Sequence, residues 1–407
     1  MKFSKLRPRR YQLKKTATAV ADQGHPWIFR SHLSTAAEVF EDGQWLRLVD
    51  GANHVLGYGI YEKEGIVGIR VLKLGEQEPT AKWLEDEVRE AILRRGEALR
   101  ACSAWRAING ENDGLPGITF DVYGDTGVLQ TYSPVLDGMG RFCAGVLRRR
   151  LGLSSVLWKF PSKRRGKRPD RMLFGPPVAE VAVQEGALRW RADLASGQKS
   201  GAFLDLRCLR RWILGQDWRG LRVLDLFSYT GVLGLAAEIA GAREVLHVDD
   251  SASALEFGKQ HHTRIASRHQ WIKADIFRWF PELPREEVFD AIIVDPPQMA
   301  SSTTALERAL IAYRRLYKEA ARRLAPRGVL IACCCTSRIQ RARLRSLLVE
   351  WLAPRLSLEG ELTTEPDHPV GFPEGDYLKI FVFRADGPGN DGEDKDETRS
   401  QGSPRLA

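Results

Sequence analysis

Apolar and polar positions form their clearest pattern between residues 222 and 250. An apolar run at 223–226 is followed by a turn at 228–231, after which apolar residues recur at helical spacing. A second apolar run at 245–248 ends in Asp249. This succession of strand, tight turn, helix and strand predicts the start of a doubly wound α/β unit.

The turn and the end of the second strand indicate a nucleoside-binding site. Gly231 lets backbone approach a ligand closely at the helix N-terminus, and Asp249 can accept hydrogen bonds from ribose hydroxyls. Residues 225–233 lack the G-x-G-x-x-G pattern that binds a pyrophosphate, and they include the acidic Asp225. A cationic ligand without phosphate, such as S-adenosylmethionine, therefore fits best. The alternative is an ordinary βαβ unit that binds no cofactor.

Weaker patterns outside this stretch predict additional domains. Short apolar runs broken by glycines at 46–72 indicate a β-rich module. A helix over 82–102, a hairpin over 118–132 and a helix over 139–151 indicate a small middle domain. The sequence therefore predicts four parts: a β-rich module at 1–76, a small α+β hairpin domain at 77–190, a doubly wound Rossmann-like domain at 191–385 and a disordered acidic tail at 386–407.

Several polar residues are predicted to meet at one edge of the doubly wound sheet. Strands at 271–275, 289–295, 328–335 and 377–383 and a helix over 305–324 are expected to complete this domain. In such a sheet, ligands bind beyond the carboxyl ends of the strands. The side chains that should cluster there are Asp225, Asp249, Asp275, Asp295 and the cysteines at 333–335.

Composition and charge narrow the class of protein. The 407 residues include no signal peptide and no apolar run long enough to span a bilayer, so we expect a soluble, cytoplasmic protein. The net charge is +9, but the tail holds six acidic and three basic residues, so the remainder carries about +12. A surplus of that size favours a polyanionic partner, nucleic acid first. A generic solvated basic surface is the alternative.

Two basic segments are candidates for RNA contact. Near the N-terminus Arg9 and Arg10 precede Tyr11, and the aromatic segment 25–30 follows. Basic side chains can neutralise phosphates while exposed aromatic rings stack on bases, although Trp27 can equally be a core residue. The second segment, 159–171, is predicted to be an exposed loop, either solvated or in contact with RNA. Its candidate contacts are Lys163, Arg164, Arg165, Lys167 and Arg168.

The cysteines offer a nucleophile. The spacing of the six cysteines fits neither a disulfide framework nor a C-x-x-C metal site, so reduced thiols and no metal are expected. A thiolate that adds to carbon 6 of a pyrimidine makes carbon 5 nucleophilic enough to attack a methyl sulfonium. Cys335 lies nearest the expected crevice and is the candidate nucleophile, while Cys333 and Cys334 are predicted to be small core residues. Asp295 is expected to orient the base.

Several motifs resemble the ribosomal RNA large-subunit methyltransferase I family, which makes 5-methylcytosine in 23S ribosomal RNA. HPWIF near residue 25 and GYGIY at 57 are similar to the N-terminal PUA domain of that family, an RNA-binding β-barrel. NGENDGLPGITFDVYGD at 109–125 is similar to its middle hairpin domain. SGQKSGAFLDLR, VLDLFSYTG, VDPP and DHPVGFPEGDYLK resemble its catalytic motifs. The resemblance covers about residues 5 to 384.

This resemblance implies roles for individual residues. Cys335 falls on the cysteine of the family's S-C-S-like segment. The residues expected to bind or frame S-adenosylmethionine are Phe203, Asp225, Phe227, Ser228, Tyr229, Thr230, Gly231, Asp249, Asp275 and Asp295. The sequence departs from the family pattern at Gln298-Met299-Ala300, where Ala-Phe-Ala is usual, and at the very basic loop 163–168. These departures bear on the choice of target base.

The sequence thus predicts an S-adenosylmethionine-dependent RNA methyltransferase that acts on carbon 5 of a cytosine in 23S ribosomal RNA. Methylation of a purine in the same RNA, a non-catalytic RNA-binding assembly factor and a small-molecule methyltransferase are the alternatives. A homodimer is compatible with the sequence.

Overall fold

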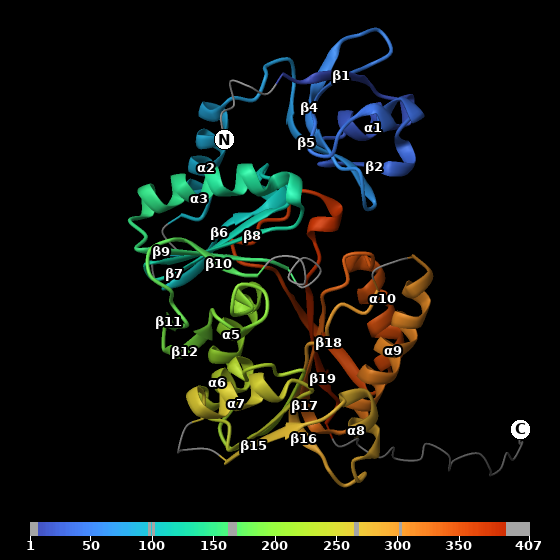
Figure 1. The fold of residues 1–407 in the computed structure, drawn as a ribbon. Helices are drawn as coiled ribbons and strands as arrows, with labels where there is room; N and C mark the ends of the chain where they lie inside the picture. Colours follow the sequence, from blue (N-terminus) through green and yellow to red (C-terminus); the bar gives the residue numbers. More distant parts are fainter. Residues whose placement is uncertain are drawn as a thin grey trace, which may run out of the picture.

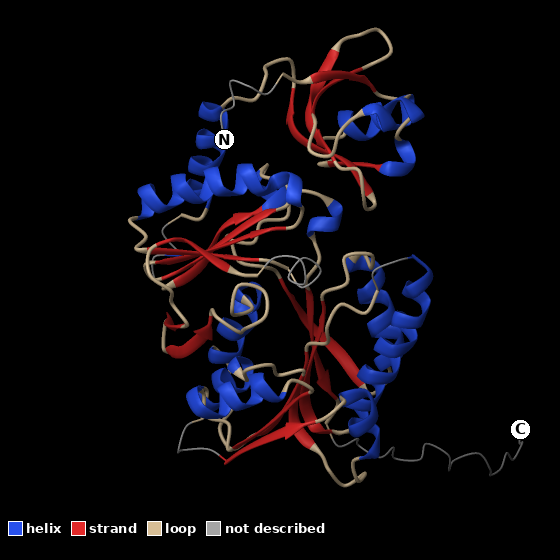
Figure 2. Cartoon of the chain, viewed as in Figure 1, coloured by secondary structure: helices blue, strands red, loops and turns tan. Residues whose placement is uncertain are grey.

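The computed structural model describes residues 7–96, 99, 102–161, 169–263, 268–300 and 303–387. Three parts, each built around a sheet, follow one another along the chain (Figure 1), and strands form the centre of each (Figure 2). The predicted RNA contacts Lys163, Arg164, Arg165, Lys167 and Arg168, and most of the predicted tail, lie outside the described residues.

The N-terminal part is a five-stranded sheet of order β1-β3-β4-β5-β2. Its elements are β1 (Arg9–Gln12), α1 (Lys15–Asp22), β2 (Trp27–Phe29), β3 (Trp45–Val49), β4 (Val55–Tyr61) and β5 (Val67–Leu74). β1 pairs with β3 in parallel and the other neighbours are antiparallel. One compact core, including Tyr11, Ile28 and Leu46, lies under it. The short strands predicted from the glycine-broken runs are confirmed.

Trp27 lies at a junction of all three parts. Its indole nitrogen donates to Glu111 Oε1 of the middle part at 2.8 Å, and Arg70 donates to the same oxygen at 2.7 Å. Its ring meets Phe372 of the C-terminal part edge to face, with ring centroids 5.1 Å apart. Through these contacts the half-buried Trp27 joins the three parts, so it is not a core residue of the N-terminal sheet alone.

The middle part is a five-stranded sheet of order β10-β9-β8-β7-β6 with two helices. Its elements are α2 (Ala81–Arg94), β6 (Ala104–Asn109), β7 (Ile118–Tyr123), β8 (Thr126–Thr131), α3 (Asp137–Leu151), β9 (Ser155–Lys159) and β10 (Arg171–Phe174). The hairpin β11 (Glu180–Glu185) and β12 (Leu188–Asp193) follows. The predicted helix over 82–102 is too long: it ends at Arg94 because Gly96 adopts the left-handed conformation, with φ +61°.

The prediction of an exposed loop at 159–171 is wrong at its first residues. Lys159 ends β9 and is fully buried, as is Phe160. The Lys159 ammonium donates to the carbonyl oxygens of Leu194 and Gly197 at 2.8 and 2.7 Å. A buried lysine is tolerated where its donors are satisfied, and these bonds fasten the segment that enters the C-terminal part.

The C-terminal part contains the predicted doubly wound sheet, of order β15-β14-β13-β16-β17-β19-β18. The strands are β13 (Arg222–Leu226), β14 (Glu244–Asp249), β15 (Arg268–Lys273), β16 (Phe289–Val294), β17 (Leu324–Cys334), β18 (Leu356–Leu362) and β19 (Lys379–Ala385). The helices are α5 (Arg207–Leu214), α6 (Val232–Ile239), α7 (Ala252–His261), α8 (Ile276–Glu282), α9 (Thr303–Arg322) and α10 (Arg341–Leu352). β19 runs antiparallel to both of its neighbours and the other pairs are parallel.

Two apolar cores lie on the two faces of this sheet. α5 and α6 pack on one face and α8, α9 and α10 on the other. Successive residues of a strand point to opposite faces, so Cys333 belongs to the first core and Cys334 to the second. Both are fully buried, as predicted. Within the described residues, none of the helices is long and apolar enough to cross a membrane.

Candidate active site

The carboxyl ends of five parallel strands form a continuous edge. Ser228 N, just after β13, donates to Val248 O of β14 at 3.1 Å, and Asp295 N, just after β16, donates to Leu226 O of β13 at 3.4 Å. The thiol of Cys335, just after β17, donates to Pro296 O at 3.5 Å. These contacts bring the ends of β14, β13, β16 and β17 together, as the sheet topology predicts.

The turn after β13 has an unusual backbone conformation. Phe227, Tyr229 and Gly231 all have left-handed φ angles, of 61°, 51° and 74°. Tyr229 N donates to one oxygen of the Asp249 carboxylate and Ser251 N to the other, each at 2.8 Å. Each oxygen keeps a lone pair for a further donor, such as a ribose hydroxyl.

Gly231 is required by packing as well as by conformation. A Cβ atom at this position would lie 2.6 Å from the Trp271 ring and 2.9 Å from His247 Nδ1. These two rings stack, with centroids 3.9 Å apart, and support the turn from below. Thr230, next to Gly231, is buried and its carbonyl oxygen accepts from His262 Nδ1 at 2.6 Å.

Asp225 lies beneath the turn, not at the open edge. It is fully buried within β13, and its Oδ2 accepts from Gly234 N of α6 at 3.1 Å. Its other carboxylate oxygen and the Ser228 hydroxyl are buried and have no hydrogen-bond partner among the described residues. Buried polar atoms are normally satisfied, so these two indicate that the site accepts a polar ligand.

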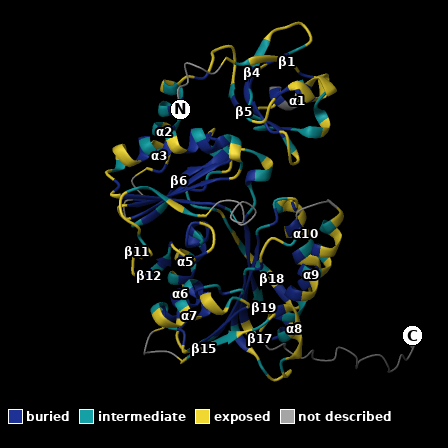
Figure 3. Ribbon diagram, in the orientation of Figure 1, coloured by how far each residue is buried: buried dark blue, intermediate teal, exposed yellow. Residues whose placement is uncertain are grey.

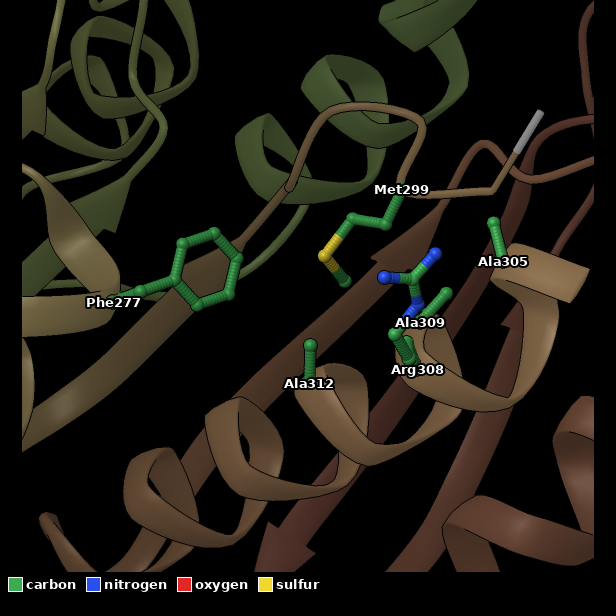
Figure 4. Close-up of a pocket in the computed structure, with 6 residues that line it drawn as sticks. All are labelled: Phe277, Met299, Ala305, Arg308, Ala309 and Ala312. Atoms are coloured by element: carbon green, nitrogen blue, oxygen red, sulfur yellow. The ribbon is translucent and has the colours of Figure 1, made fainter.

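An apolar pocket extends this edge between α8, α9 and the loop after β16. It has a volume of about 380 Å³ and is lined by Phe277, Met299, Ala305, Arg308, Ala309 and Ala312 (Figure 4). Phe277 packs on Phe227, with ring centroids 5.6 Å apart, and its amide donates to the carboxylate of Asp275, the N-cap of α8. Asp275 was among the predicted cofactor residues and Met299 was noted as a departure from the family pattern, whereas Phe277 was not predicted.

Asp295 and Cys335 occupy the opposite side of the edge. Burial and the nearby Asp205 carboxylate raise the pKa of Asp295 to about 7. Among the described residues, no side chain donates a hydrogen bond to the Asp295 carboxyl. Burial and the Asp295 carboxylate raise the pKa of the Cys335 thiol to about 12, and the ammonium of Lys199 opposes this rise.

Lys199 and Asp205 were not among the predicted site residues. The Lys199 ammonium lies 3.5 Å from Asp205 Oδ2 and 4.4 Å from the centre of the Phe203 ring. Asp205 also accepts from the Tyr377 hydroxyl at 2.7 Å. Phe203 in turn meets Tyr229 edge to face, with centroids 5.2 Å apart. Both residues lie in the motif SGQKSGAFLDLR, which resembles a catalytic motif of the family, so the sequence could have identified them as site residues.

The middle part fixes the backbone around Lys199. The Ser200 hydroxyl donates to Asp121 and lies 3.0 Å from the Tyr123 hydroxyl, both residues of β7. Asp121 also forms a two-pronged ion pair with Arg106, at 2.7 and 3.0 Å. Because all four side chains are buried, the segment that carries Lys199 is held rigidly.

Of the basic residues predicted to contact RNA, Arg9 and Arg10 are described. Both are exposed on β1. The Arg9 guanidinium lies over the Phe40 ring, 5.1 Å from its centre, and Arg10 donates to Asn53 at 2.7 Å. They are therefore available at the surface of the N-terminal sheet.

Comparison with known proteins now assigns the chain to a family. A family profile described as S-adenosylmethionine-dependent methyltransferase matches residues 161–384, more than half of the chain. The chain belongs to the S-adenosylmethionine-dependent methyltransferases. A second profile, a PUA-like domain, matches residues 12–74 of this methyltransferase. The predicted class I fold with an N-terminal PUA-like domain is confirmed.

Relatives match the methyltransferase over nearly its whole length. A ribosomal RNA large subunit methyltransferase of Deinococcus radiodurans is 28% identical over 400 residues, which cover 93% of this chain and 97% of the relative. The ribosomal RNA large subunit methyltransferase I of Tolumonas auensis is 30% identical over 384 residues, 89% of this chain and 95% of the relative. A methyltransferase crystallised in complex with SAH has the same fold, with a TM-score of 0.82 at 20% identity, covering 93% of this chain and all of that one.

The residues at the strand ends fit the cofactor of this family. The Asp249 carboxylate has lone pairs free to accept from ribose hydroxyls, and the Ser228 hydroxyl beside it has no hydrogen-bond partner among the described residues. Phe277 and Met299 line the apolar pocket that extends this edge. Sequence reasoning thus predicted the cofactor correctly from the missing phosphate-binding glycines.

A buried histidine, His262, next to the turn after β13 is expected to make the stability of the protein depend on pH. His262 Nε2 accepts from Arg191 N at 3.0 Å, so the ring is neutral with its proton on Nδ1, and burial lowers the pKa of His262 to about 4. The unfolded chain takes up this proton near pH 6.5, so the free energy of unfolding should fall by about 3 kcal/mol between about pH 6.5 and 4. Urea denaturation across this range measures the loss.

The matched variants are His262→Gln and His54→Gln. The first removes the buried titrating ring, so its stability should fall less with pH than that of the wild type. The second alters a histidine whose side chain is 76% exposed and should keep the wild-type pH dependence. An unchanged pH dependence in His262→Gln would show that this ring is not the acid-sensitive group.

Proposed function

We propose that this methyltransferase methylates carbon 5 of a cytosine in 23S ribosomal RNA through a thiolate adduct of Cys335 at carbon 6. The observation that carries the proposal is the position of Cys335, whose thiol contacts Pro296 O in the turn that carries Asp295. The names of the relatives support ribosomal RNA of the large subunit as the substrate. S-adenosylmethionine, when bound, supplies an electrophilic methyl group.

The division of labour between the domains is part of the proposal. Residues 1–76 hold structured RNA through exposed basic residues such as Arg9 and Arg10, residues 77–190 brace the catalytic segment, and residues 191–385 carry out methyl transfer. The contacts of Ser200 with Asp121 and Tyr123 support the bracing role of the middle domain.

Cys335 acts as the nucleophile in the proposed sequence. After the thiol has lost its proton, its sulfur forms a bond to carbon 6 and the 5,6 double bond opens. Carbon 5 would then take the methyl group of the bound cofactor as the bond between that methyl and the sulfonium sulfur breaks, leaving S-adenosylhomocysteine. A base then removes the proton from carbon 5, the electron pair re-forms the double bond, and the carbon–sulfur bond breaks. Cys335 returns to its starting state, and the RNA leaves with one additional methyl group.

Asp295 assists by sharing its proton with N3 of the cytosine. With a pKa of about 7, the carboxyl group is protonated in about half of the molecules at neutral pH, so it can donate to N3. A proton at N3 draws electrons from the ring and makes carbon 6 more electrophilic. The same carboxyl can instead accept from the exocyclic amine when it is ionised.

Lys199 offsets the unfavourable ionisation of the thiol. The pKa of Cys335 is raised to about 12 by burial and by the Asp295 carboxylate, so the thiolate is rare before RNA binds. Once Asp295 holds its proton against the base, that negative charge is gone and the Lys199 ammonium favours the thiolate. Lys199 is therefore a positioning and electrostatic residue for the nucleophile.

Replacing Lys199 with methionine should lower the rate of methyl transfer about tenfold and shift the pH–rate profile of the thiol to higher pH. Lys199→Arg, which keeps the charge, should recover part of the rate. Single-turnover methylation measured across pH tests both effects. If Lys199→Met had the same pH–rate profile as the wild type, the electrostatic role would be refuted, even if this variant were slower.

The proposed substrate is tested by identifying the methylated nucleoside. Large-subunit ribosomal RNA lacking the modification is incubated with the enzyme and labelled S-adenosylmethionine, then digested to nucleosides. We expect the label in 5-methylcytidine. If the label is found in a methylated purine, the proposed target is wrong. If the protein binds the RNA but transfers no labelled methyl group, it is a non-catalytic RNA-binding protein.

A further inference from the structure

The segment from α9 through β17 to the end of α10 is the most basic part of the C-terminal domain. Residues 303–355 contain twelve arginine and lysine residues and three glutamates, a net charge of +9. That equals the net charge of the entire chain, so the other residues together are neutral. A local concentration of positive charge indicates where a polyanionic partner binds, whereas the net charge of the chain indicates only that such a partner is favoured.

Helix geometry places five of these twelve cations on one side of α9. The inner side of α9 is buried through Ala309, Tyr313 and Tyr317, which pack in the core under the sheet. Figure 3 shows exposed residues along the outer side of the helix. The basic residues there, which we call the α9 stripe, are Arg308, Arg314, Arg315, Lys318 and Arg322. At 1.5 Å per residue, the stripe is about 21 Å long.

The stripe is poorly neutralised by the protein itself. Arg322 pairs with Glu319 at 3.4 Å. For the other four cations, no ion pair with a described residue is present. Like charges one turn apart repel each other, and neighbours such as Arg314 and Lys318 stand at this spacing. A bound polyanion would relieve the repulsion.

Basic residues connect the stripe to the catalytic edge. Arg338 follows Cys335 by three residues and Arg343 lies in the first turn of α10, and both are exposed without an ion pair to a described residue. α9 and α10 pack side by side on the same face of the sheet (Figure 1). Both helices begin near the carboxyl edge of the sheet, so the charge extends away from the active site.

We propose that the α9 stripe, together with Arg338 and Arg343, binds the phosphate backbone of the RNA substrate next to the target nucleotide. The inference rests on the proposed function. RNA fits better than a membrane because Ile311 is the only large apolar side chain exposed on the stripe, and membrane-bound helices insert a broad apolar face. This surface is formed by the C-terminal part and is separate from the N-terminal domain.

Removing three charges of the stripe should weaken RNA binding. The variant Arg314→Gln, Arg315→Gln, Lys318→Gln leaves the pocket residue Arg308 intact. We expect its affinity for a large-subunit ribosomal RNA fragment to fall about tenfold or more at physiological salt, and the slope of log K against log salt to decrease by about 2. KM for RNA should rise with little change in kcat, and the affinity for S-adenosylmethionine should stay the same.

A matched control removes the same charge elsewhere. The variant Arg189→Gln, Arg219→Gln, Arg243→Gln alters three exposed arginines, two of them before the amino ends of β13 and β14, away from the catalytic edge. It should bind RNA almost as the wild type does. Equal losses in the two variants, or none in the stripe variant, would overturn the inference while leaving the proposed function standing.

Two further outcomes are distinguishable. If the wild type itself fails to bind the RNA, the proposed function fails, and the inference fails with it. If the stripe variant keeps its RNA affinity but loses binding to vesicles that contain phosphatidylglycerol, the surface is a membrane contact and the inference is overturned. Both variants should have the same midpoint temperature of thermal unfolding as the wild type, which shows that folded proteins are being compared.

Discussion

Cys335→Ala is expected to lower methyl transfer to RNA by roughly four orders of magnitude or more, because the side chain that forms the proposed covalent bond to carbon 6 is removed. The affinity for S-adenosylmethionine should stay near that of the wild type, since Asp249 and the turn after β13 are unchanged. Single-turnover methylation and equilibrium cofactor binding measure the two quantities separately.

Cys334→Ala is the matched control for this variant. Cys334 is the preceding residue, but it is fully buried in the core between the sheet and α9, so its loss should cost stability of about 1 kcal/mol and little activity. If Cys335→Ala stayed active, the nucleophile assignment would be wrong, although methyl transfer itself would not be in question.

Asp295→Asn is expected to reduce kcat about 10² to 10⁴-fold, because asparagine cannot transfer a proton to N3 of the base. In the wild type, kcat should decline as the pH rises above about 7, where the raised pKa of Asp295 leaves the carboxyl ionised. The pH–rate profile of the asparagine variant should lack this decline. If kcat of the asparagine variant still declined above about pH 7, a group other than Asp295 would be responsible for the decline.

The same substitution has a second effect that can be measured without RNA. The Asp295 carboxylate is a main cause of the raised pKa of Cys335, so removing its charge should lower that pKa and make the thiol alkylate faster at neutral pH. Asp275→Asn is the control, since it removes a carboxylate of the cofactor side. It should raise KM for S-adenosylmethionine without changing the alkylation of Cys335.

The positions of the residues proposed to bind the cofactor were predictable because their determinants are local. The turn between 226 and 232 and Asp249 lie within one strand-turn-helix-strand unit, and the topology of doubly wound sheets brings the ends of later strands to the same edge. The positions of Asp295 and Cys335 followed from that rule. The order β17-β19-β18 could not follow from it, because the rule concerns parallel strands and β19 runs antiparallel to both of its neighbours.

The rest of the site depends on contacts between distant parts of the chain. Lys199 and Asp205 meet Tyr377 from a distant part of the chain, and the middle domain holds the segment around Ser200. The buried Lys159 could not be distinguished from a loop residue by charge alone, because two carbonyl oxygens of a later segment satisfy its ammonium. Sequence patterns indicate periodicity and local chemistry, but they do not show which distant residues will be in contact in the folded protein.

Trapping the enzyme on RNA that carries 5-fluorocytosine at the target position tests the central claim most directly. Fluorine cannot leave carbon 5 as a cation, so the carbon–sulfur bond formed by Cys335 should persist after methyl transfer. We expect a covalent protein–RNA complex that requires S-adenosylmethionine, forms with Cys334→Ala and is absent with Cys335→Ala. An enzyme that methylates ordinary RNA but forms no such complex would contradict the thiolate mechanism.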